Sequence, residues 1–111
     1  MIKWGGVMDK YIIVTTLCDK EEIVNKIVDT LLEKKLIAGS QVSKVHSKYW
    51  WDSKLEECDE YKLEFRTKES KFSIIESEIK KIHNYEVAEI SYYEIKNASK
   101  EFLDWIDKNV K

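Results

Sequence analysis

The sequence contains no proline and only three glycines among its 111 residues. A chain of this length usually forms one domain, and this one has no Pro- or Gly-rich linker that would divide it. No apolar run approaches the roughly 20 residues of a membrane-spanning helix, so no membrane partner is expected. Residues 1–10 lack the apolar centre of a signal peptide, so we expect a loose leader there, with Met8 as an alternative start, and one domain over residues 11–111.

Cysteine and net charge are also scarce. Cys18 and Cys58 are the only cysteines and form no C-x-x-C pair, which disfavours a zinc knuckle or a dithiol redox motif. Without a secretion signal, two free thiols in a reducing cytoplasm are expected. The net charge of −2 and the pI of about 5.8 disfavour a nucleic-acid partner.

The first part of the chain has the pattern of a strand followed by a helix. Residues 11–17 (YIIVTTL) are apolar and β-branched, which is typical of a buried strand. Asp19 is placed to cap a helix, and Glu22 three residues later completes a capping box. Apolar residues then recur at helical spacing, and Lys34 and Lys35 fall in the expected last turn, where cations suit the helix dipole.

The middle of the chain predicts a long hairpin. Residues 36–51 form its first strand, and a slip in the alternation between Val42 and Val45 indicates a bulge. Residues 52–54 form the turn, and residues 55–67 return as the next strand, with apolar and charged side chains alternating near its end.

The last part of the chain predicts two helices around a fourth strand. Thr67 is placed to cap the first of them, whose buried stripe consists of Phe72, Ile75, Ile79 and Ile82. Residues 83–86 form a turn and residues 87–95 a strand. Asn97 or Ser99 then caps the final helix.

The resulting order is β-α-β-β-α-β with an extra C-terminal helix. This is the α+β, ferredoxin-like pattern: a four-stranded antiparallel sheet with two helices on one face. Two helices leave the other face uncovered, and that face carries Tyr, Trp and Val side chains, so we expect it to meet something else. The fold alone does not identify a function, because it carries many.

Three aromatic residues stand side by side at the expected hairpin tip: Tyr49, Trp50 and Trp51. Neighbouring side chains of a strand point to opposite faces, so one sheet face cannot accommodate all three. Stacking on RNA bases is one use of such aromatics on this fold, but the RNP consensus is absent. Because a buried Trp removes about 200 Å² from water, an interface between chains is the favoured interpretation.

The segments VTTLCDKEE, LIAGSQV, KYWWDSKLEE, FRTKES, HNYEVAEI and FLDWI occur in this order over about residues 11–108. Together they resemble the CutA-like divalent-ion tolerance family, and the aromatic hairpin and the H-x-Y-E-x-x-E-I segment are the most specific parts. The resemblance implies a homotrimer with an arrangement like that of PII signalling proteins, in which long hairpins pair strands between subunits. It also implies a link to divalent-metal tolerance, copper in particular, and no established enzymatic reaction.

Two functions follow from this resemblance. The first is a cytoplasmic, non-enzymatic homotrimer that binds divalent cations, Cu(II) foremost, and contributes to metal-ion tolerance without an obligatory cofactor. The alternative is a PII-like signalling or scaffold module, whose clefts between subunits bind a small metabolite or a protein partner.

Some residues depart from the family pattern. Thr15 stands where some members have a Cys proposed as a copper ligand, and Asn84 and Ala88 stand where the family has two prolines. Ser53 replaces the usual Gly of the hairpin turn. If that position requires a left-handed backbone, Ser is disfavoured there by roughly 1 kcal/mol; otherwise the turn differs.

His83 and Glu89 match the family positions suggested as metal contacts, and Cys18 is a possible replacement for the missing third ligand. Imidazole suits Cu(II) and Zn, and a thiolate favours Cu(I). The helix start beside Cys18 lowers the pKa of a thiol, whereas the adjacent Asp19 opposes that effect. The alternative interpretation is a surface His and a Glu paired for structural reasons.

A second candidate set, by the same resemblance, is a cleft between subunits formed by Arg66, Lys68, Tyr85 and Glu86 together with Glu89. A cation, a phenol and carboxylates suit a small anion or a metal-bound ligand. The alternative is a set of ion pairs that locks the trimer.

Two further hairpin features receive no specific role. Residues 56–60 are acidic except for Cys58 and are expected to form a solvated strand edge. His46 is expected to point outward. The sequence contains no nucleophile–base pair, Gly-rich phosphate loop or HExxH motif, so no enzyme class is indicated.

Overall fold

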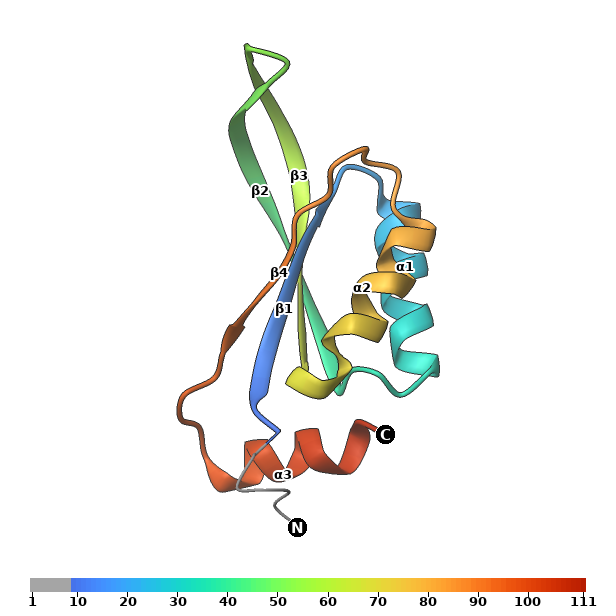
Figure 1. Ribbon diagram of the computed structural model, residues 1–111, viewed down its shortest axis with the longest axis vertical. Helices are drawn as coiled ribbons and strands as arrows, with labels where there is room; N and C mark the ends of the chain where they lie inside the picture. The colour runs from blue at the N-terminus through green and yellow to red at the C-terminus, as the bar shows by residue number, and fades with distance from the viewer. Residues whose placement is uncertain (1–8) are drawn as a thin grey trace.

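The computed structural model describes residues 9–111, and its elements follow the predicted order (Figure 1). The elements are β1 (Tyr11–Cys18), α1 (Glu21–Glu33), β2 (Gly39–Trp51), β3 (Lys54–Lys68), the short 3-10 helix η1 (Glu69–Lys71), α2 (Phe72–Ile82), β4 (Ile90–Glu94) and α3 (Lys100–Asn109). The strands form one antiparallel sheet in the order β2-β3-β1-β4. The fold is therefore the predicted ferredoxin-like α+β fold with an extra C-terminal helix.

The core lies between the sheet and the α1–α2 layer on one of its faces (Figure 1). The β1–β3 register pairs Val14 with Phe65, so alternate residues of both strands point into this core. The predicted stripe of α2 is confirmed, since Ile75 and Ile79 are fully buried. Each such side chain contributes about 1.5–3 kcal/mol by burial. No helix within residues 9–111 has the length and apolar character needed to cross a membrane.

The start of α1 differs from the prediction. Lys20 occupies the N-cap position and no side chain caps the helix, so the capping box of Asp19 and Glu22 is wrong. Asp19 instead accepts a hydrogen bond from the side-chain amide of Asn84 at 3.3 Å. The Asp19 carboxylate therefore bonds to a residue distant in sequence and not to the start of α1.

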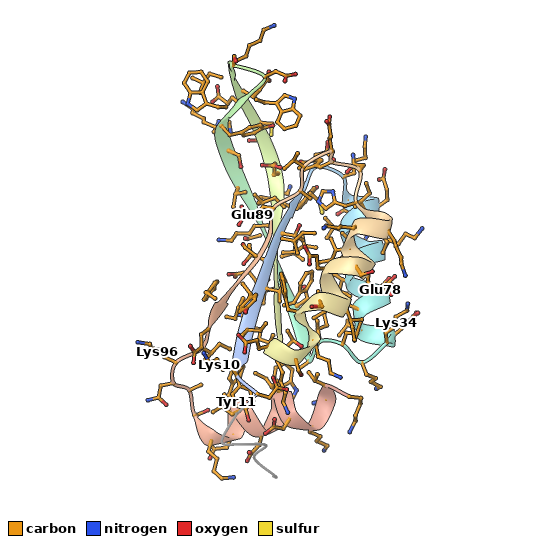
Figure 2. The ribbon with its side chains drawn as sticks, in the orientation of Figure 1. Lys10, Tyr11, Lys34, Glu78, Glu89 and Lys96 are labelled. Carbon is orange, nitrogen blue, oxygen red and sulfur yellow. The ribbon has the colours of Figure 1, made fainter. Side chains whose placement is uncertain are left out.

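The end of α1 also differs, because both predicted last-turn lysines lie beyond the helix. Lys34 is the C-cap residue, and its ammonium lies 2.9 Å from Glu78 of α2 (Figure 2), which lowers the pKa of that carboxyl. Lys35 has a φ of 60°, and the N–H of Leu36 donates to the carbonyl of Leu31 at 3.0 Å. This is a Schellman ending with Lys in the left-handed position that Gly usually fills.

The predicted capping role of Thr67 is wrong. Thr67 is a buried residue of β3, and its hydroxyl donates to the carbonyl of Leu36 at 2.6 Å. The strand continues to Lys68, and α2 follows η1 with Lys71 as an N-cap that makes no side-chain hydrogen bond.

The β2–β3 pairing is continuous, so the predicted bulge between Val42 and Val45 is also wrong. The register ends with Trp51 opposite Lys54, which leaves Asp52 and Ser53 as a two-residue turn. Their φ values of 51° and 61° are those of a type I′ hairpin turn. Ser53 therefore does adopt the left-handed conformation that favours Gly.

The hairpin projects from the rest of the molecule (Figure 1). The β1–β3 pairing ends with Cys18 opposite Tyr61, so among the strands of residues 9–111 β3 pairs only with β2 before that point. We call residues 45–60 the hairpin arm. The principal extents are 49 × 26 × 24 Å and the radius of gyration is 15.3 Å, against about 13 Å for a compact chain of this length.

The fourth strand is shorter than predicted. It begins at Ile90, opposite Thr16, and residues 87–89 stay outside the sheet with Val87 exposed. The loop before β4 is held against β3 instead, because the hydroxyl of Tyr85 donates a hydrogen bond to Glu60.

The C-terminal helix lies across the end of the sheet opposite the hairpin tip (Figure 1). Ser99 caps it by accepting the N–H of Phe102 at 3.2 Å, which decides between the two predicted caps, Asn97 and Ser99. A Cβ on Gly39 would lie 2.8 Å from the Trp105 ring, so any other residue at position 39 would force this ring to move.

Asp107 fastens α3 to the sheet. It accepts the Tyr11 hydroxyl at 2.7 Å and pairs with the Lys68 ammonium at 2.5 Å. The hydrogen bond to Asp107, together with burial, raises the pKa of Tyr11 to about 12.

The predicted leader and the alternative start at Met8 lie outside the described residues, except for residues 9 and 10. Asp9 accepts both the N–H and the hydroxyl of Ser70, at 2.9 and 2.5 Å. The carbonyl of Lys10, just before β1 (Figure 2), accepts the N–H of Glu69 at 2.8 Å. These two residues are thus tied to the start of η1.

Candidate functional site

His83 lies directly after α2, and both of its ring nitrogens contact the backbone. Nε2 lies 2.7 Å from the carbonyl oxygen of Leu17, so it donates. Nδ1 accepts the N–H of Tyr85 at 3.1 Å. This pair of bonds corresponds to the tautomer with the proton on Nε2. A metal ion can bind His83 only if one of these backbone bonds opens.

Cys18 is the predicted ligand that the structure places beside His83. Its Sγ lies 3.5 Å from Nε2, and the side chain is fully buried at the end of β1. Burial raises the pKa of the Cys18 thiol to about 11, and the charges of Asp19 and Glu60 act in the same direction. Asp19 therefore raises the pKa of the thiol as expected, and burial raises it by a larger amount. Cys18 and Cys58 are both free, as predicted.

Glu89 lies on the segment leading into β4 (Figure 2), and it accepts a hydrogen bond from the hydroxyl of Ser91 at 2.9 Å. Across residues 9–111, no three His, Cys, Asp or Glu side chains form a ready metal-binding group. Of the predicted ligand set, the structure thus shows one contact, between Cys18 and His83.

The predicted cleft residues lie at two separate places along β3. Lys68 pairs with Asp107 at one end, and Arg66 donates to the carbonyl of Glu64 at 3.5 Å. Tyr85 contacts Glu60, which lies eight residues before Lys68 in the same strand. At about 3.3 Å per residue, Glu60 and Lys68 are more than about 20 Å apart along the strand. A single chain therefore does not bring Tyr85 together with Lys68, and the cleft between subunits stays a prediction.

Glu60 is a functional candidate that the sequence did not indicate. The other carboxylates of residues 56–60 are exposed as expected, but Glu60 is only 5% exposed. The Tyr85 hydroxyl donates to its Oε2 at 2.5 Å. Burial and this bond raise the pKa of Tyr85 far above its ordinary value. The partner comes from a loop 25 residues later, so no local pattern in the hairpin could reveal the burial.

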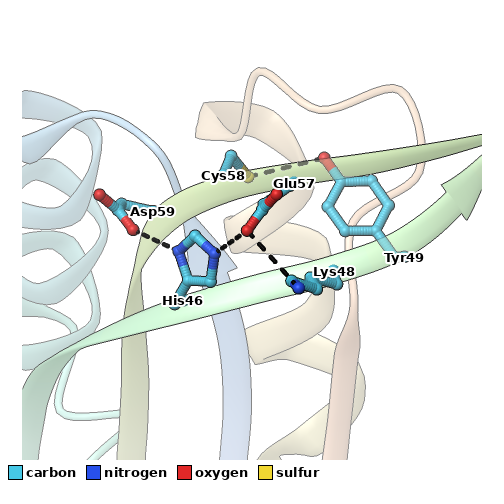
Figure 3. A network of polar contacts seen from close by, with 6 residues as sticks. All are labelled: His46, Lys48, Tyr49, Glu57, Cys58 and Asp59. Carbon is cyan, nitrogen blue, oxygen red and sulfur yellow. Dashed lines mark hydrogen bonds and ion pairs between the residues drawn. The ribbon is translucent and has the colours of Figure 1, made fainter.

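His46 is the second missed residue. It was expected to point outward without a role, and it is exposed, but both nitrogens face carboxylates of β3 (Figure 3). Nδ1 lies 2.7 Å from Asp59 and Nε2 lies 2.5 Å from Glu57. These two hydrogen bonds raise the pKa of His46. Lys48 lies 3.8 Å from the same Glu57 oxygen.

A hollow of about 520 Å³ adjoins His46 at the base of the hairpin arm. It is lined by Asp19, Lys44, Val45, His46, Asp59, Glu60 and Tyr61. Lys44 lies over the ring of Tyr61, with its nitrogen 5.9 Å from the ring centre. Carboxylates, cations and a phenol ring therefore share one open depression.

The tip of the hairpin arm is an exposed apolar surface. Trp50 is 73% and Leu55 is 65% exposed, and Tyr49 and Trp51 are also exposed. The Tyr49 hydroxyl lies 3.7 Å from the Cys58 sulfur (Figure 3). Contiguous exposed apolar surface marks interaction sites. Within residues 9–111 these aromatics stay exposed, so the predicted interface between chains remains a prediction.

Comparison with known proteins identifies the family. Residues 12–109 match the model of the CutA1 divalent ion tolerance protein family. The chain is 37% identical to the divalent-cation tolerance protein CutA of Archaeoglobus fulgidus over 80% of this chain and 87% of that protein. It is 31% identical to that of Pyrococcus horikoshii over 90% and 98%.

Solved structures agree. The structure of the periplasmic divalent cation tolerance protein CutA from Archaeoglobus fulgidus superposes with a TM-score of 0.88 at 33% identity, covering 91% of this chain and 99% of that one. CutA1 from Pyrococcus horikoshii superposes with a TM-score of 0.85 at 30% identity, over 90% and 98%. The chain therefore belongs to the CutA1 divalent-ion tolerance family.

Proposed function

We propose that this protein is a cytoplasmic homotrimer that binds divalent cations, Cu(II) foremost, and contributes to metal-ion tolerance by binding rather than by catalysis. Membership of a family named for divalent-ion tolerance is the observation that carries the metal function. The uncovered aromatic tip of the hairpin arm supports assembly, because a permanent interface would bury it.

The Cys18–His83 contact supports one metal site, with Glu89 as a further ligand supplied by the segment before β4. Binding there requires Nε2 of His83 to release the carbonyl of Leu17 and the buried thiol to lose its proton. Calorimetry with Cu(II) on the protein and on His83→Ala tests this site. Equal heats from both proteins would remove His83 from it.

Light scattering tests the trimer. The expected mass is three times that of the 13.2 kDa chain at micromolar concentration. A mass of one chain would contradict the assembly, and with it the cleft between subunits formed by Arg66, Lys68, Tyr85 and Glu86.

The second candidate function is a PII-like signalling or scaffold module. The hollow beside Lys44 and Glu60 favours it, since convergent charges and an aromatic ring in a depression suit a small polar metabolite. Native mass spectrometry of protein isolated from its own cells should then show a co-purified small molecule. An empty trimer with no thermal shift across a metabolite panel would contradict this function.

A further inference from the structure

We propose that His46 and Glu57 form an exposed transition-metal site on the hairpin arm, with Asp59 orienting the imidazole ring. The inference rests on the proposed metal-binding function and names a different ligand for it. The ligand class is a borderline divalent ion such as Cu(II) or Zn(II), for which imidazole nitrogen is a preferred donor.

The chain has two histidines, and their ring nitrogens differ in the partners that they contact. His83 has its lone pair on Nδ1 engaged by the Tyr85 N–H and its Nε2 proton engaged by the Leu17 carbonyl. Within residues 9–111, the ring nitrogens of His46 bond to no backbone atom, and each of them faces a carboxylate. An incoming ion therefore reaches an imidazole at His46 without opening any backbone hydrogen bond.

The geometry of the His46–Glu57 pair suits replacement of a proton by a metal ion. Nε2 and the Glu57 oxygen are 2.5 Å apart, and the side chains are 53% and 55% exposed. Metal–nitrogen and metal–oxygen bonds are about 2.0–2.2 Å, so the two atoms need to separate to about 3 Å. Exposed side chains can make this movement, and water fills the remaining coordination positions.

Asp59 occupies the position of an outer partner. Metal-bound histidines usually donate their other ring N–H to a carboxylate, which fixes the ring and raises its basicity. Nδ1 of His46 lies 2.7 Å from Asp59 in this arrangement. Two protein donors and one orienting carboxylate are fewer than a closed structural site, so the site is open and exchangeable.

The surroundings contain charges of both signs. Asp19, Asp59 and Glu60 line the adjoining hollow and attract cations, while Lys44 lines it as well and opposes them. Lys48, at 3.8 Å from Glu57, competes directly with the ion. Replacement of Lys48 by Met should therefore tighten binding about twofold, the effect of one exposed charge pair.

Proton NMR with Cu(II) chloride tests the site, because the ion broadens signals of nearby nuclei. The two histidine ring signals are assigned by their loss in His46→Ala and His83→Ala. We expect substoichiometric Cu(II) to broaden the His46 signal while the His83 signal stays sharp. Broadening of His83 first would overturn the inference.

Calorimetry with Cu(II) supplies the second measurement. His46→Ala should weaken binding at least tenfold and Asp59→Asn about tenfold, the usual effect of losing an outer partner. Glu56→Gln is the matched control, because Glu56 loses the same charge in the same strand but lies opposite Tyr49. Unchanged binding in His46→Ala overturns this site and leaves the proposed function intact. No binding by the unmodified protein overturns both.

Discussion

The two halves of the β2–β3 hairpin have the same backbone pairing but opposite surroundings. Near the base, Leu63 and Phe65 are fully buried, because β1 and the two helices flank this part of β3. In the hairpin arm, Trp50 and Leu55 face solvent, because within residues 9–111 no third strand pairs with β2 or β3 there. The base is stabilised by the chain's own core, whereas the arm depends on cross-strand pairs and on whatever covers it.

The largest effect is expected in the core. Phe65→Ala should lower the free energy of unfolding by about 3–5 kcal/mol, because it leaves a cavity among buried side chains. Urea denaturation measures this loss. Ile74→Ala, at an exposed position of α2, is the control and should change stability by less than about 0.5 kcal/mol. Equal losses in the two variants would mean that Phe65 is not part of a packed core.

A smaller effect, seen in assembly rather than in folding, is expected at the arm. Trp50→Ala should leave the fold of the chain intact and weaken association of the proposed trimer by about 2 kcal/mol or more, as for a buried aromatic anchor. Light scattering over a dilution series measures the shift toward single chains. Trp105→Ala is the control, since Trp105 packs on Gly39 far from the arm. A trimer equally stable in both variants would separate Trp50 from the interface.

One residue in the arm and one beside the core have a left-handed backbone conformation. Ser53 in the arm and Lys35 beside the core have φ values of 61° and 60°. Replacement of either by Gly should stabilise the protein by about 1 kcal/mol, because Gly adopts this conformation without strain. If only Lys35→Gly raises the midpoint of global urea unfolding, the arm opens independently of the core. Equal gains would show that the arm and core unfold as one unit.

The smallest effect concerns alkaline pH at the end of the molecule opposite the arm. The pKa of Tyr11 is raised to about 12 by Asp107, so the folded state keeps this proton above pH 10, where the unfolded state loses it. The contribution of the Tyr11–Asp107 hydrogen bond to the free energy of unfolding is full below about pH 10 and is lost as the pH rises toward 12. Ultraviolet titration of tyrosinate should show this late ionisation move toward its ordinary range in Asp107→Asn. A late ionisation unchanged in that variant would contradict the assignment.

The core was predictable from sequence because burial of one face of a helix or strand imposes a regular spacing on its apolar residues. The stripe containing Ile75 and Ile79 repeats at helical spacing, and β1 is rich in apolar and β-branched residues, so element order and fold followed. The caps were not predictable in the same way. Asp19 and Thr67 match local rules for helix caps, but their partners lie 65 and 31 residues away in the chain. Tertiary hydrogen bonds override a local preference of about 1 kcal/mol.

The His46 contacts were missed through an error of one residue in the turn. A three-residue turn over residues 52–54 would place His46 opposite Glu60, whereas the observed two-residue turn pairs it with Asp59. Such a shift moves every side chain of one strand to the other face. The arm has no buried face that would have exposed the error in the sequence pattern.

The type I′ turn at Asp52 and Ser53 has a consequence for the order of folding. Without Gly at either left-handed position, the tip is a poor point of nucleation, so we infer that the hairpin closes from its base outward. Ser53→Gly should then slow unfolding and leave the folding rate unchanged, which stopped-flow kinetics can measure. Each chain would complete its own core before its aromatic tip becomes ordered. In the proposed trimer, subunits would then meet as folded partners, which limits entanglement of their strands during synthesis.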